Sequence, residues 1–582
     1  MRPRYLLLVS HGEDFTARAD RIATATGLRV CHRASRIAVL ANEDCSCLAI
    51  SADHLVVGTL FHRHGPPRAI VAFDNTERIT LLNGRTAALL ASYWGGYISL
   101  SVRGDAVEIL RDPSGALPCY QTAIGGIALF ASDMELLSAG GAVHGGVGWD
   151  ALGRMLFSSG LPTRETALVG IDMILAGTTL VLDGHREETV TNWSPWDFAE
   201  PPAGEDQAAA SERLLRAIDQ AVGAWTLRYR HPLLSVSGGL DSSIVAACIA
   251  RSVGEQSGRQ ASCITLYTDD PAGDERDYAR QVCAPLDLPL VECRYTLDAV
   301  DLGRALGAHL PRPAGRVEAQ PYEEAHRAVA AQVGADAFFT GNGGDNVFGY
   351  SQSAAALADR ALHEGPGAGA FATLRDICRQ TGAGPLRVTR AAMRIARAAP
   401  GYRWRPSPAF LHPELIASLQ GLAFAHPWLE APPGALPGKA AHIAGLLRAQ
   451  VTLEPDRSRF APVVHPLLSQ PVVETCLSIP SWQWRSGGRD RAAARDAFAD
   501  RLPRPILERR GKGTPDPFCG EIVARKRGEL RERLMDGQLA AHRLLDKNAI
   551  EETLRPDRPT TGEENVRLLE LANVEAWLSY WP

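Results

Sequence analysis

One feature constrains the fold of this chain most. It is a short apolar run followed by two glycines and several hydroxyl side chains. The run at 233–236 predicts a buried strand, and the pattern at 243–251 predicts a helix after a tight turn. Between them stands Ser237-Gly238-Gly239-Leu240-Asp241-Ser242-Ser243. Glycines let the backbone approach an anion, and the start of a helix offers unpaired N–H groups. The string therefore predicts a phosphate-binding loop, although the GK[ST] ending of a Walker A loop is missing.

A second loop, Thr340-Gly341-Asn342-Gly343-Gly344-Asp345-Asn346, follows the apolar run at 337–339. In a parallel sheet both loops would leave the carboxyl ends of strands, where ligands bind. Asp241 alone would repel phosphate, so it fits there only with a divalent ion between the two, and Asp345 supplies a second carboxylate. We predict an Mg²⁺ site at Asp241 and Asp345.

Lysine is rare in this chain and occurs only at positions 439, 512, 526 and 547. One of the four stands between glycines in the run Arg509-Arg510-Gly511-Lys512-Gly513-Thr514. An ammonium group at Lys512 could neutralise the charge that develops on pyrophosphate and on a tetrahedral intermediate. We therefore predict that Lys512 reaches into the site.

The order of expected elements divides the chain at a proline-rich joint at 193–204. Before the joint, short alternating runs predict strands at 36–40, 55–60, 97–102, 126–131 and 178–182. After it, a helical pattern at 208–224 and the runs at 233–236, 261–267 and 337–340 predict a parallel sheet with helices on both faces. From about 355 the chain is rich in Ala and Arg and mostly helical. We predict an α/β protein with a β-rich layered domain at 1–200 and an α/β domain at 201–582.

Composition excludes several classes of partner. A net charge of −5 and a pI of 6.4 create no field that would attract nucleic acid. The apolar run at 5–9 is too short to span a bilayer or to serve as the core of a signal peptide. Eleven cysteines without paired spacing indicate free thiols in a reducing compartment. We expect a cytoplasmic enzyme with no membrane span and no nucleic-acid partner.

In their order, the three loops resemble the synthetase domain of the asparagine synthetase family, whose pattern is SGGxDSS, then GxGxD, then R-x-K-G. The segments at 193–195, 274–279 and 465–480 resemble further parts of that domain, and 200–525 is covered. The resemblance implies a PP-loop ATP pyrophosphatase domain with a helical C-terminal part.

The resemblance also implies roles for individual residues. Residues 237–243 would grip the pyrophosphate of ATP, and adenosine would contact the backbone of Val236, Ile264, Thr340 and Gly341. Asp241 and Asp345 would hold Mg²⁺, and Lys512 would stabilise acyl transfer. ATP and Mg²⁺ are therefore the expected cofactors.

The first half resembles the glutaminase domain of the same family at 111–115 and 118–120, which implies an Ntn-hydrolase-like layered fold. That glutaminase uses a cysteine at position 2 as its nucleophile, and this sequence has Arg2. We therefore expect a degenerate domain that does not hydrolyse glutamine.

The residue after the first glycine of the second loop is typically Glu in asparagine synthetases and Tyr in β-lactam synthetases. Here it is Asn342, and the string GNGGDN joined to a domain without the cysteine most resembles the lasso peptide cyclases. Asn342 therefore joins Lys512, Asp241 and Asp345 as a candidate catalytic residue.

A cyclase of this kind adenylates an Asp or Glu side chain of a precursor peptide, and the α-amine of the same peptide then closes an isopeptide bond. The resemblance implies a precursor peptide, a leader peptidase and a leader-binding protein as partners. Glu454 and Glu323 are candidates for the base that deprotonates the amine. The Arg-rich stretch at 375–405 is open to two interpretations, a solvated surface or a platform for the precursor.

Three alternatives stay open. A β-lactam synthetase would adenylate a small β-amino acid, and an ammonia-dependent asparagine synthetase would adenylate aspartate. A catalytically inactive peptide-binding scaffold is a third, against which the intact Asp241, Asp345 and Lys512 count.

Overall fold

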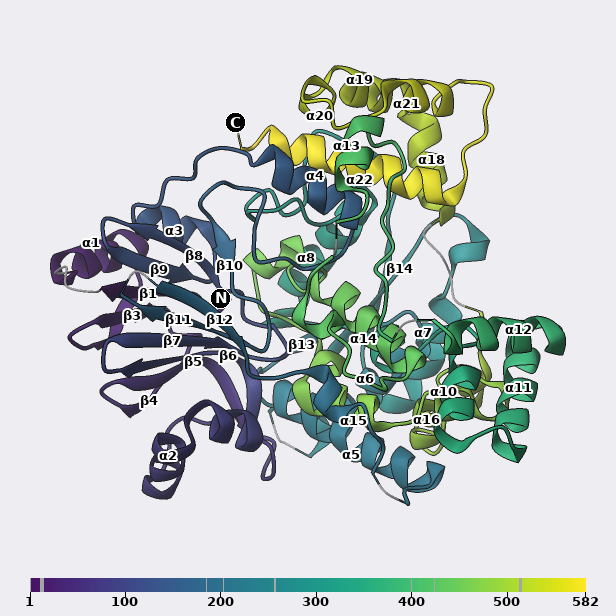
Figure 1. Ribbon diagram of the computed structural model, residues 1–582, viewed down its shortest axis with the longest axis horizontal. Coiled ribbons are helices and arrows are strands. Elements are labelled where there is room, and N and C mark those ends of the chain that lie inside the picture. The colour runs from purple at the N-terminus through teal and green to yellow at the C-terminus, as the bar shows by residue number, and fades with distance from the viewer. Residues whose placement is uncertain are drawn as a thin grey trace.

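Three β-sheets organise the computed structural model of this protein, two antiparallel and one parallel (Figure 1). The structure describes residues 2–10, 15–184, 186–202, 204–255, 258–398, 400–422, 424–511 and 516–581. In Figure 1 the antiparallel sheets lie to the left, and the helices that surround the parallel sheet lie to the centre and right.

The two antiparallel sheets have six strands each and belong to the first part of the chain. The first sheet has the order β10 (Asp172–Met173), β8 (Tyr120–Ile124), β9 (Ile127–Ala131), β1 (Tyr5–Ser10), β3 (Ile37–Ala41) and β2 (Arg29–Arg33). The second has the order β12 (Arg186–Thr191), β11 (Thr178–Asp183), β7 (Ala106–Arg111), β6 (Tyr93–Arg103), β5 (His54–His62) and β4 (Cys47–Ser51).

Strand β1 shows why the two sheets stack. Successive side chains of a strand point to opposite faces. Tyr5, Leu7 and Val9 therefore enter the core between the sheets, with partners such as Val57 and Ile109. Leu6 and Leu8 face the other side, in the core that α1 (Thr16–Thr26) and α3 (Met134–Ala139) cover. A strand buried on both faces is apolar throughout, as the run at 5–9 is.

The parallel sheet has five strands, in the order β15 (Leu290–Arg294), β14 (Ser262–Tyr267), β13 (Pro232–Ser235), β16 (Ala337–Phe339) and β17 (Val463–Val464). Because β13 and β16 are neighbours, the loops that follow them leave the same edge of the sheet. The helices linked to this sheet are α5 (Gln207–Thr226), α6 (Leu240–Gly254), α7 (Arg276–Cys283), α8 (Gln320–Val333) and α9 (Gly344–Val347).

The remaining helices line the first part of the chain and build its C-terminal half. In the first part these are α2 (Asn75–Ser92) and α4 (Trp149–Ser158). A group at the lower right of Figure 1 contains α10 (Ala355–Glu364), α11 (Ala368–Thr381) and α12 (Pro385–Ala396). Then follow α13 (Pro413–Leu419), α14 (Pro437–Gln450), α15 (Gln470–Ser478), α16 (Ala492–Ala497) and α17 (Arg504–Glu508). The group at the top contains α18 (Asp516–Arg525), α19 (Arg527–Asp536), α20 (Gln538–Ala541), α21 (Lys547–Thr553) and α22 (Gly562–Leu578).

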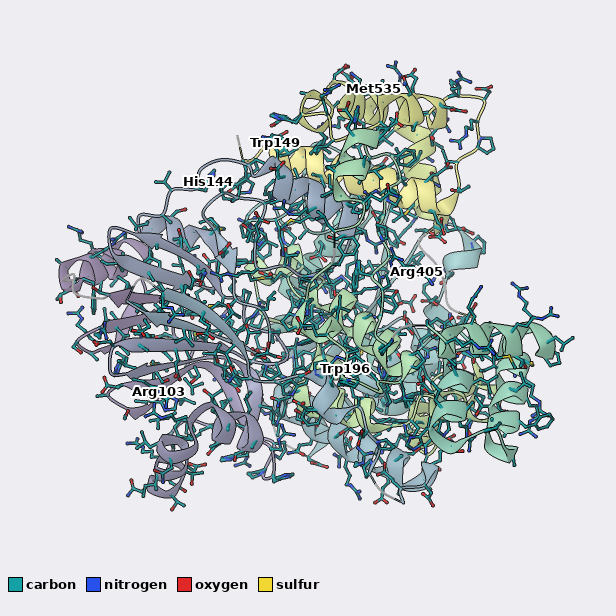
Figure 2. The ribbon with its side chains drawn as sticks, in the orientation of Figure 1. Arg103, His144, Trp149, Trp196, Arg405 and Met535 are labelled. Atoms are coloured by element: carbon teal, nitrogen blue, oxygen red, sulfur yellow. The ribbon has the colours of Figure 1, made fainter. Side chains whose placement is uncertain are left out.

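The second sheet joins the two parts of the chain. Its outer face contributes Leu60 and Trp94 to the same core as Leu214 and Trp225 of α5. Figure 2 labels Trp196 near the middle of the molecule, where its indole N–H donates to the carbonyl of Trp428 at 2.9 Å. The two parts therefore share one continuous apolar core.

The structure confirms the predicted fold class, an α/β protein with a β-rich layered first part and a helical C-terminal part. One boundary differs, because α6 begins at Leu240 rather than at residue 243. Asp241, Ser242 and Ser243 therefore lie in the first turn of the helix. The domain boundary near residue 200 stays a prediction. No helix in the described part of the chain has the length and apolar character needed to cross a bilayer.

Candidate active site

The loop between β13 and α6 takes a shape that only glycine permits at one position. Gly238 has a φ of 63°, and a Cβ there would lie 2.2 Å from the Cβ of Tyr278. Gly239 then caps α6 without a side-chain hydrogen bond. The N–H groups of the first helical turn therefore receive no side-chain cap and are suited to bind an anion.

The hydroxyl groups of this loop divide into two kinds. Ser243 is fully buried and its hydroxyl donates to the carbonyl of Gly239 at 2.7 Å, so it supports the shape of the turn. Ser237 and Ser242 line the cavity in front of the loop, and the hydroxyl of Ser242 makes only a longer bond to the same carbonyl, at 3.3 Å. They are therefore the hydroxyl groups placed to meet a ligand.

The second loop lies directly against the first. A Cβ on Gly341 would lie 2.6 Å from the backbone nitrogen of Ser242, and one on Gly344 would lie 2.3 Å from the Cγ of Asp241. Glycine is thus required at both positions by the close approach of the loops. The two glycine-rich strings that the sequence separates form one continuous surface.

The carboxylates of Asp241 and Asp345 converge on one cationic side chain, Arg491. Its Nη1 lies 3.2 Å from Oδ1 of Asp241 and 2.6 Å from Oδ1 of Asp345. Burial disfavours the charged form of Arg491, but these two carboxylates and that of Asp490, 3.1 Å from its Nε, together outweigh that effect and raise its pKa. The loops therefore place two negative charges around a single positive group.

This arrangement fits a magnesium ion that is shared with phosphate. Mg²⁺ in such sites takes one or two carboxylates and completes its octahedron with water and phosphate oxygens. Within the described residues no set of three His, Cys, Asp or Glu side chains converges, so a dedicated all-protein metal cage is not formed there. An ion between the two carboxylates would require Arg491 to give up part of its contact with them, since like charges repel.

A cavity of about 590 Å³ lies in front of the loops and is lined by most of the predicted ATP-binding residues. Those in its wall are Val236, Ser237, Gly239, Leu240, Asp241, Ser242, Ile264, Thr340 and Gly341. Of the described candidates, Gly238, Ser243 and Asp345 are not in the wall. Lys512 lies outside the described residues, although its neighbour Gly511 lines the cavity. The roles of all these residues stay predictions.

Asn342 is held in a polar network at the edge of the cavity. Its side-chain amide donates to the hydroxyl of Thr452 at 2.8 Å, and its backbone N–H donates to the hydroxyl of Thr340 at 3.1 Å. Thr340 in turn pairs with Nδ1 of His465 at 2.7 Å. Burial lowers the pKa of His465 to about 3, so this ring is neutral at physiological pH. The network orients the amide without adding a charge.

Two arginines of the site were not predicted as site residues. Arg509 donates to the carbonyls of Ser237 and Gly238 at 3.3 and 3.0 Å and pairs with Glu275. It thereby ties the first loop to the run that contains Lys512, which was the only signal in the sequence. For Arg491 no local pattern gave a signal.

The two candidate bases have different surroundings. Glu323 lines the cavity and pairs with the buried Arg457; burial raises the pKa of its carboxyl while Arg457 opposes that shift. Glu454 is absent from the described wall of this cavity, and its carboxylate accepts a hydrogen bond from the hydroxyl of Tyr120 at 2.8 Å. Of the two, Glu323 is the one in contact with the cavity.

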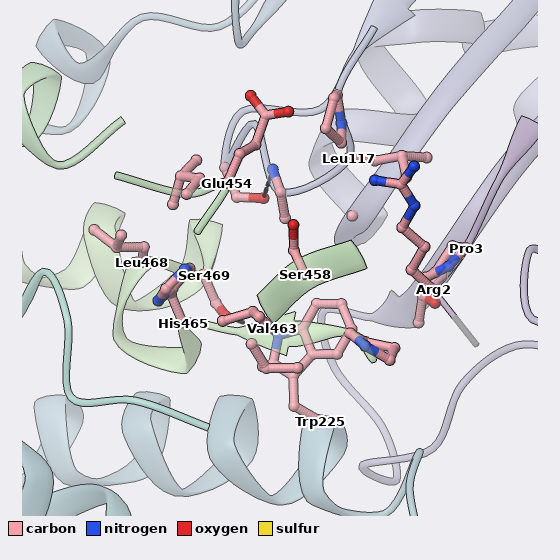
Figure 3. A pocket seen from close by; sticks show the side chains of 18 of the residues that line it. Arg2, Pro3, Leu117, Trp225, Glu454, Ser458, Val463, His465, Leu468 and Ser469 are labelled. Atoms are coloured by element: carbon pink, nitrogen blue, oxygen red, sulfur yellow. Dashed lines mark hydrogen bonds between the residues drawn. The ribbon is translucent and has the colours of Figure 1, made fainter. Parts of the chain in front are cut away.

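The position expected to carry the glutaminase nucleophile faces a small separate cavity. Figure 3 shows Arg2 on one side of it and Glu454 and His465 on the other. The guanidinium of Arg2 lies 3.3 Å from the carboxylate of Asp133. A cation held by an ion pair occupies this position.

Comparison with known proteins agrees with this geometry. The family model described as asparagine synthase matches residues 213–579. The chain belongs to the asparagine synthase family. Members of this family are ATP-dependent ligases that form carbon–nitrogen bonds, and Mg²⁺ is typical of them.

The chain is also similar to carboxyethyl-arginine beta-lactam-synthase of Streptomyces clavuligerus, with 29% identity over 178 residues. The match covers 30% of this chain and spans only 30% of that relative. Among solved structures, glutamine phosphoribosylpyrophosphate amidotransferase from B. subtilis, complexed with ADP and GMP, is 10% identical. That match covers 58% of this chain and 90% of the other, with a TM-score of 0.21. An allosteric regulatory enzyme of purine biosynthesis is 9% identical over 50% and 74% of the two chains, with a TM-score of 0.18.

Proposed function

We propose that this protein is an ATP-dependent lasso peptide cyclase. A side-chain carboxylate of a precursor peptide attacks the α-phosphorus of ATP, and pyrophosphate leaves. The α-amine of the same peptide then attacks the acyl carbon, AMP leaves, and the amine gives up a proton as the isopeptide bond forms. A precursor peptide, a leader peptidase and a leader-binding protein are the proposed partners, and the cytoplasm is the proposed location.

The single observation that carries this proposal is the junction of the two glycine-rich loops. The uncapped first turn of α6 and the carboxylate of Asp241 face one cavity, and the carboxylate of Asp345 meets that of Asp241 at Arg491. These residues are suited to bind ATP, with Mg²⁺ supplying charge neutralisation at the phosphates when it is bound. The chain itself positions the phosphates through the loop, and Lys512 would oppose the negative charge of the acyl-transfer step.

The source of the amine separates a cyclase from an ammonia-dependent enzyme. Arg2 is paired with Asp133 beside the small cavity, and a guanidinium is not a nucleophile. An amine carried on the substrate needs no such nucleophile. Holding the peptide so that amine and acyl group meet makes the second step intramolecular, which is a large gain in rate.

A second candidate, a β-lactam synthetase, is favoured by one observation, the 29% identity to carboxyethyl-arginine beta-lactam-synthase. Its substrate would be a small β-amino acid. Asn342 speaks against it, because the resemblance to that class would place Tyr at this position.

The test is a mass-spectrometric assay with synthetic leader-free peptides that have a free N-terminal amine and an Asp or Glu several residues along. We expect loss of one water from the peptide and conversion of ATP to AMP and pyrophosphate. Acetylating the amine, or changing the acceptor carboxylate to its amide, should each stop ring closure. If a β-amino acid is cyclised, or aspartate and ammonia give asparagine, while the peptides stay unchanged, the cyclase proposal is wrong.

A further inference from the structure

A second chamber lies beside the nucleotide cavity. It has a volume of about 480 Å³ and shares part of its wall with the nucleotide cavity. The shared residues are Arg316, Ala319, Glu323, Thr452 and Pro455. Because Thr452 also accepts the hydrogen bond from Asn342, the wall that the two spaces share lies beside the second glycine-rich loop.

Both parts of the chain build this chamber. Met155 and Leu175 contribute from the first part, and Leu447, Val451 and Val566 contribute from the second. The helices α4 and α22, which carry two of these residues, lie beside each other in Figure 1, and Arg567 donates to the carbonyl of Leu156 at 2.9 Å. The two parts therefore enclose a cavity here, beside the apolar core that they share.

The chemistry of the wall differs from that of the nucleotide cavity. Its sides are largely apolar, and several of its charged residues lie in ion pairs, such as Arg312 with Glu454 at 3.2 Å. Arg316, in the shared wall, pairs with Glu318 at 3.1 Å. Paired charges do not create the positive field that a phosphate would need. A space of this size takes a ligand far larger than one amino acid, and an apolar wall with a few polar groups suits a peptide.

We propose that this second chamber binds the peptide substrate and that its acceptor carboxylate passes to the nucleotide through an opening in the shared wall at Arg316 and Thr452. The proposal rests on the proposed cyclase function and assigns the site for its substrate. Arg316 lines both spaces and its Nε pairs with Glu318; because its side chain is 54% exposed, the remaining N–H groups of the guanidinium can bind the carboxylate. The apolar wall would hold the side chains of the peptide on the far side.

The first experiment fills the chamber from two different elements. Val451→Trp and Val566→Trp each add an indole to the wall without touching the nucleotide cavity. We expect each variant to raise the KM for the peptide by about tenfold or more, with the affinity for Mg-ATP unchanged. Val190→Trp on β12, where the valine is already exposed, is the matched control and should leave both values unchanged.

The opening is tested by changing its charge. Arg316→Ala should remove the preference of the protein for an Asp peptide over the matching Asn peptide, measured by fluorescence anisotropy with a non-hydrolysable ATP analogue. Arg316→Lys keeps the charge and should keep most of that preference. If Arg316→Ala preserves the preference, the carboxylate does not pass this residue.

A measurement on the unaltered protein guards against variants that fail to fold. A peptide carrying a benzophenone side chain should cross-link, on illumination, to the segments 155–176 and 447–456. Cross-links confined to other surfaces, or a normal peptide KM in both tryptophan variants, would show that the chamber is not the peptide site. If the unaltered protein neither binds nor dehydrates any of the peptides, the cyclase function itself is wrong, which is a different outcome.

Discussion

Two groups of charged residues, one in each part of the chain, differ in what pairs with their charges. In the first part, the guanidinium of Arg111 donates to the carbonyls of Leu117 and Ile174 at 2.9 and 2.8 Å. Asp112 beside it accepts from the backbone of Tyr97 and Ser114 at 3.2 and 2.8 Å. These charges are satisfied by the fold around them.

In the second part, the charges of Asp241, Asp345 and Arg491 satisfy one another beside a cavity. Their contacts join the starts of α6, α9 and α16, and Asp241 and Arg491 line the space where a ligand would enter. Charges satisfied by backbone indicate a structural role, and charges gathered at a cavity indicate a role in binding or catalysis. The comparison therefore predicts loss of stability on one side and loss of activity on the other.

The largest effect is expected at the metal-binding carboxylates. Asp241→Asn and Asp345→Asn should each lower ATP-dependent turnover by about a thousandfold or more, because several kcal/mol of charge stabilisation is lost. Thermal unfolding should change little. Turnover as a function of Mg²⁺ concentration is the measurement.

Asp183→Asn, at an exposed end of β11, is the matched control and should behave as the unaltered protein. Near-normal turnover with an unchanged Mg²⁺ requirement in either site variant would contradict the shared-ion interpretation. A large drop in melting temperature would instead show that the carboxylate stabilises the fold.

Lys512 is expected to matter next most. Lys512→Ala should lower kcat by about a hundredfold, with a small effect on ATP binding, since its charge is needed mainly as pyrophosphate leaves. Pre-steady-state kinetics with the peptide separates the two. Lys526→Ala, which removes a lysine paired with Glu529, is the control. A change confined to the KM for ATP would make Lys512 a binding residue only.

The structural charges of the first part should give the reverse result. Arg111→Met leaves buried carbonyls without their donor and removes the positive charge beside Asp112, so we expect the free energy of unfolding to fall by about 3–5 kcal/mol. The affinity of the folded protein for Mg-ATP should stay within about twofold, because Arg111 lines the second chamber and is absent from the wall of the nucleotide cavity.

Denaturant unfolding of Arg111→Met against Arg103→Met provides the comparison. The side chain of Arg103 is 52% exposed in its pair with Glu108, so its loss should cost at most about 1 kcal/mol. An Arg111 variant that stays stable but loses its affinity for Mg-ATP would overturn the distinction between the two kinds of charge.

How far the sequence predicts this molecule depends on the range of the interactions. Local patterns predicted the strands β3, β5, β6, β9 and β11 and the helix α5, because alternation and helical periodicity are read within a few residues. The start of α6 was placed three residues late, because a glycine cap leaves no side-chain signal.

The contact of Arg491 with Asp241 spans 250 residues, and only the fold brings the two together. The same holds for the second chamber, whose wall comes from segments on both sides of the proline-rich joint. The glycine-rich loops could be placed at one site from the sequence because parallel strands share an edge. Their cationic partner and the neighbouring chamber could not.

The last prediction concerns glutamine hydrolysis by the first part of the chain, which we expect to be absent. Cys119, which directly precedes β8, is fully buried, and burial raises its pKa to about 11. Roughly one molecule in ten thousand would then carry a thiolate at neutral pH, and a buried thiolate meets no substrate. Burial also raises the pKa of Cys45.

The purified protein should therefore release no glutamate from glutamine above the level of a heat-inactivated sample, in an assay coupled to glutamate dehydrogenase. Glutamate release that iodoacetamide abolishes would reveal a reactive thiol and an internal source of ammonia. The amine would then no longer have to arrive on the substrate, and an ammonia-using synthetase would replace the cyclase as the function that fits both parts of the chain.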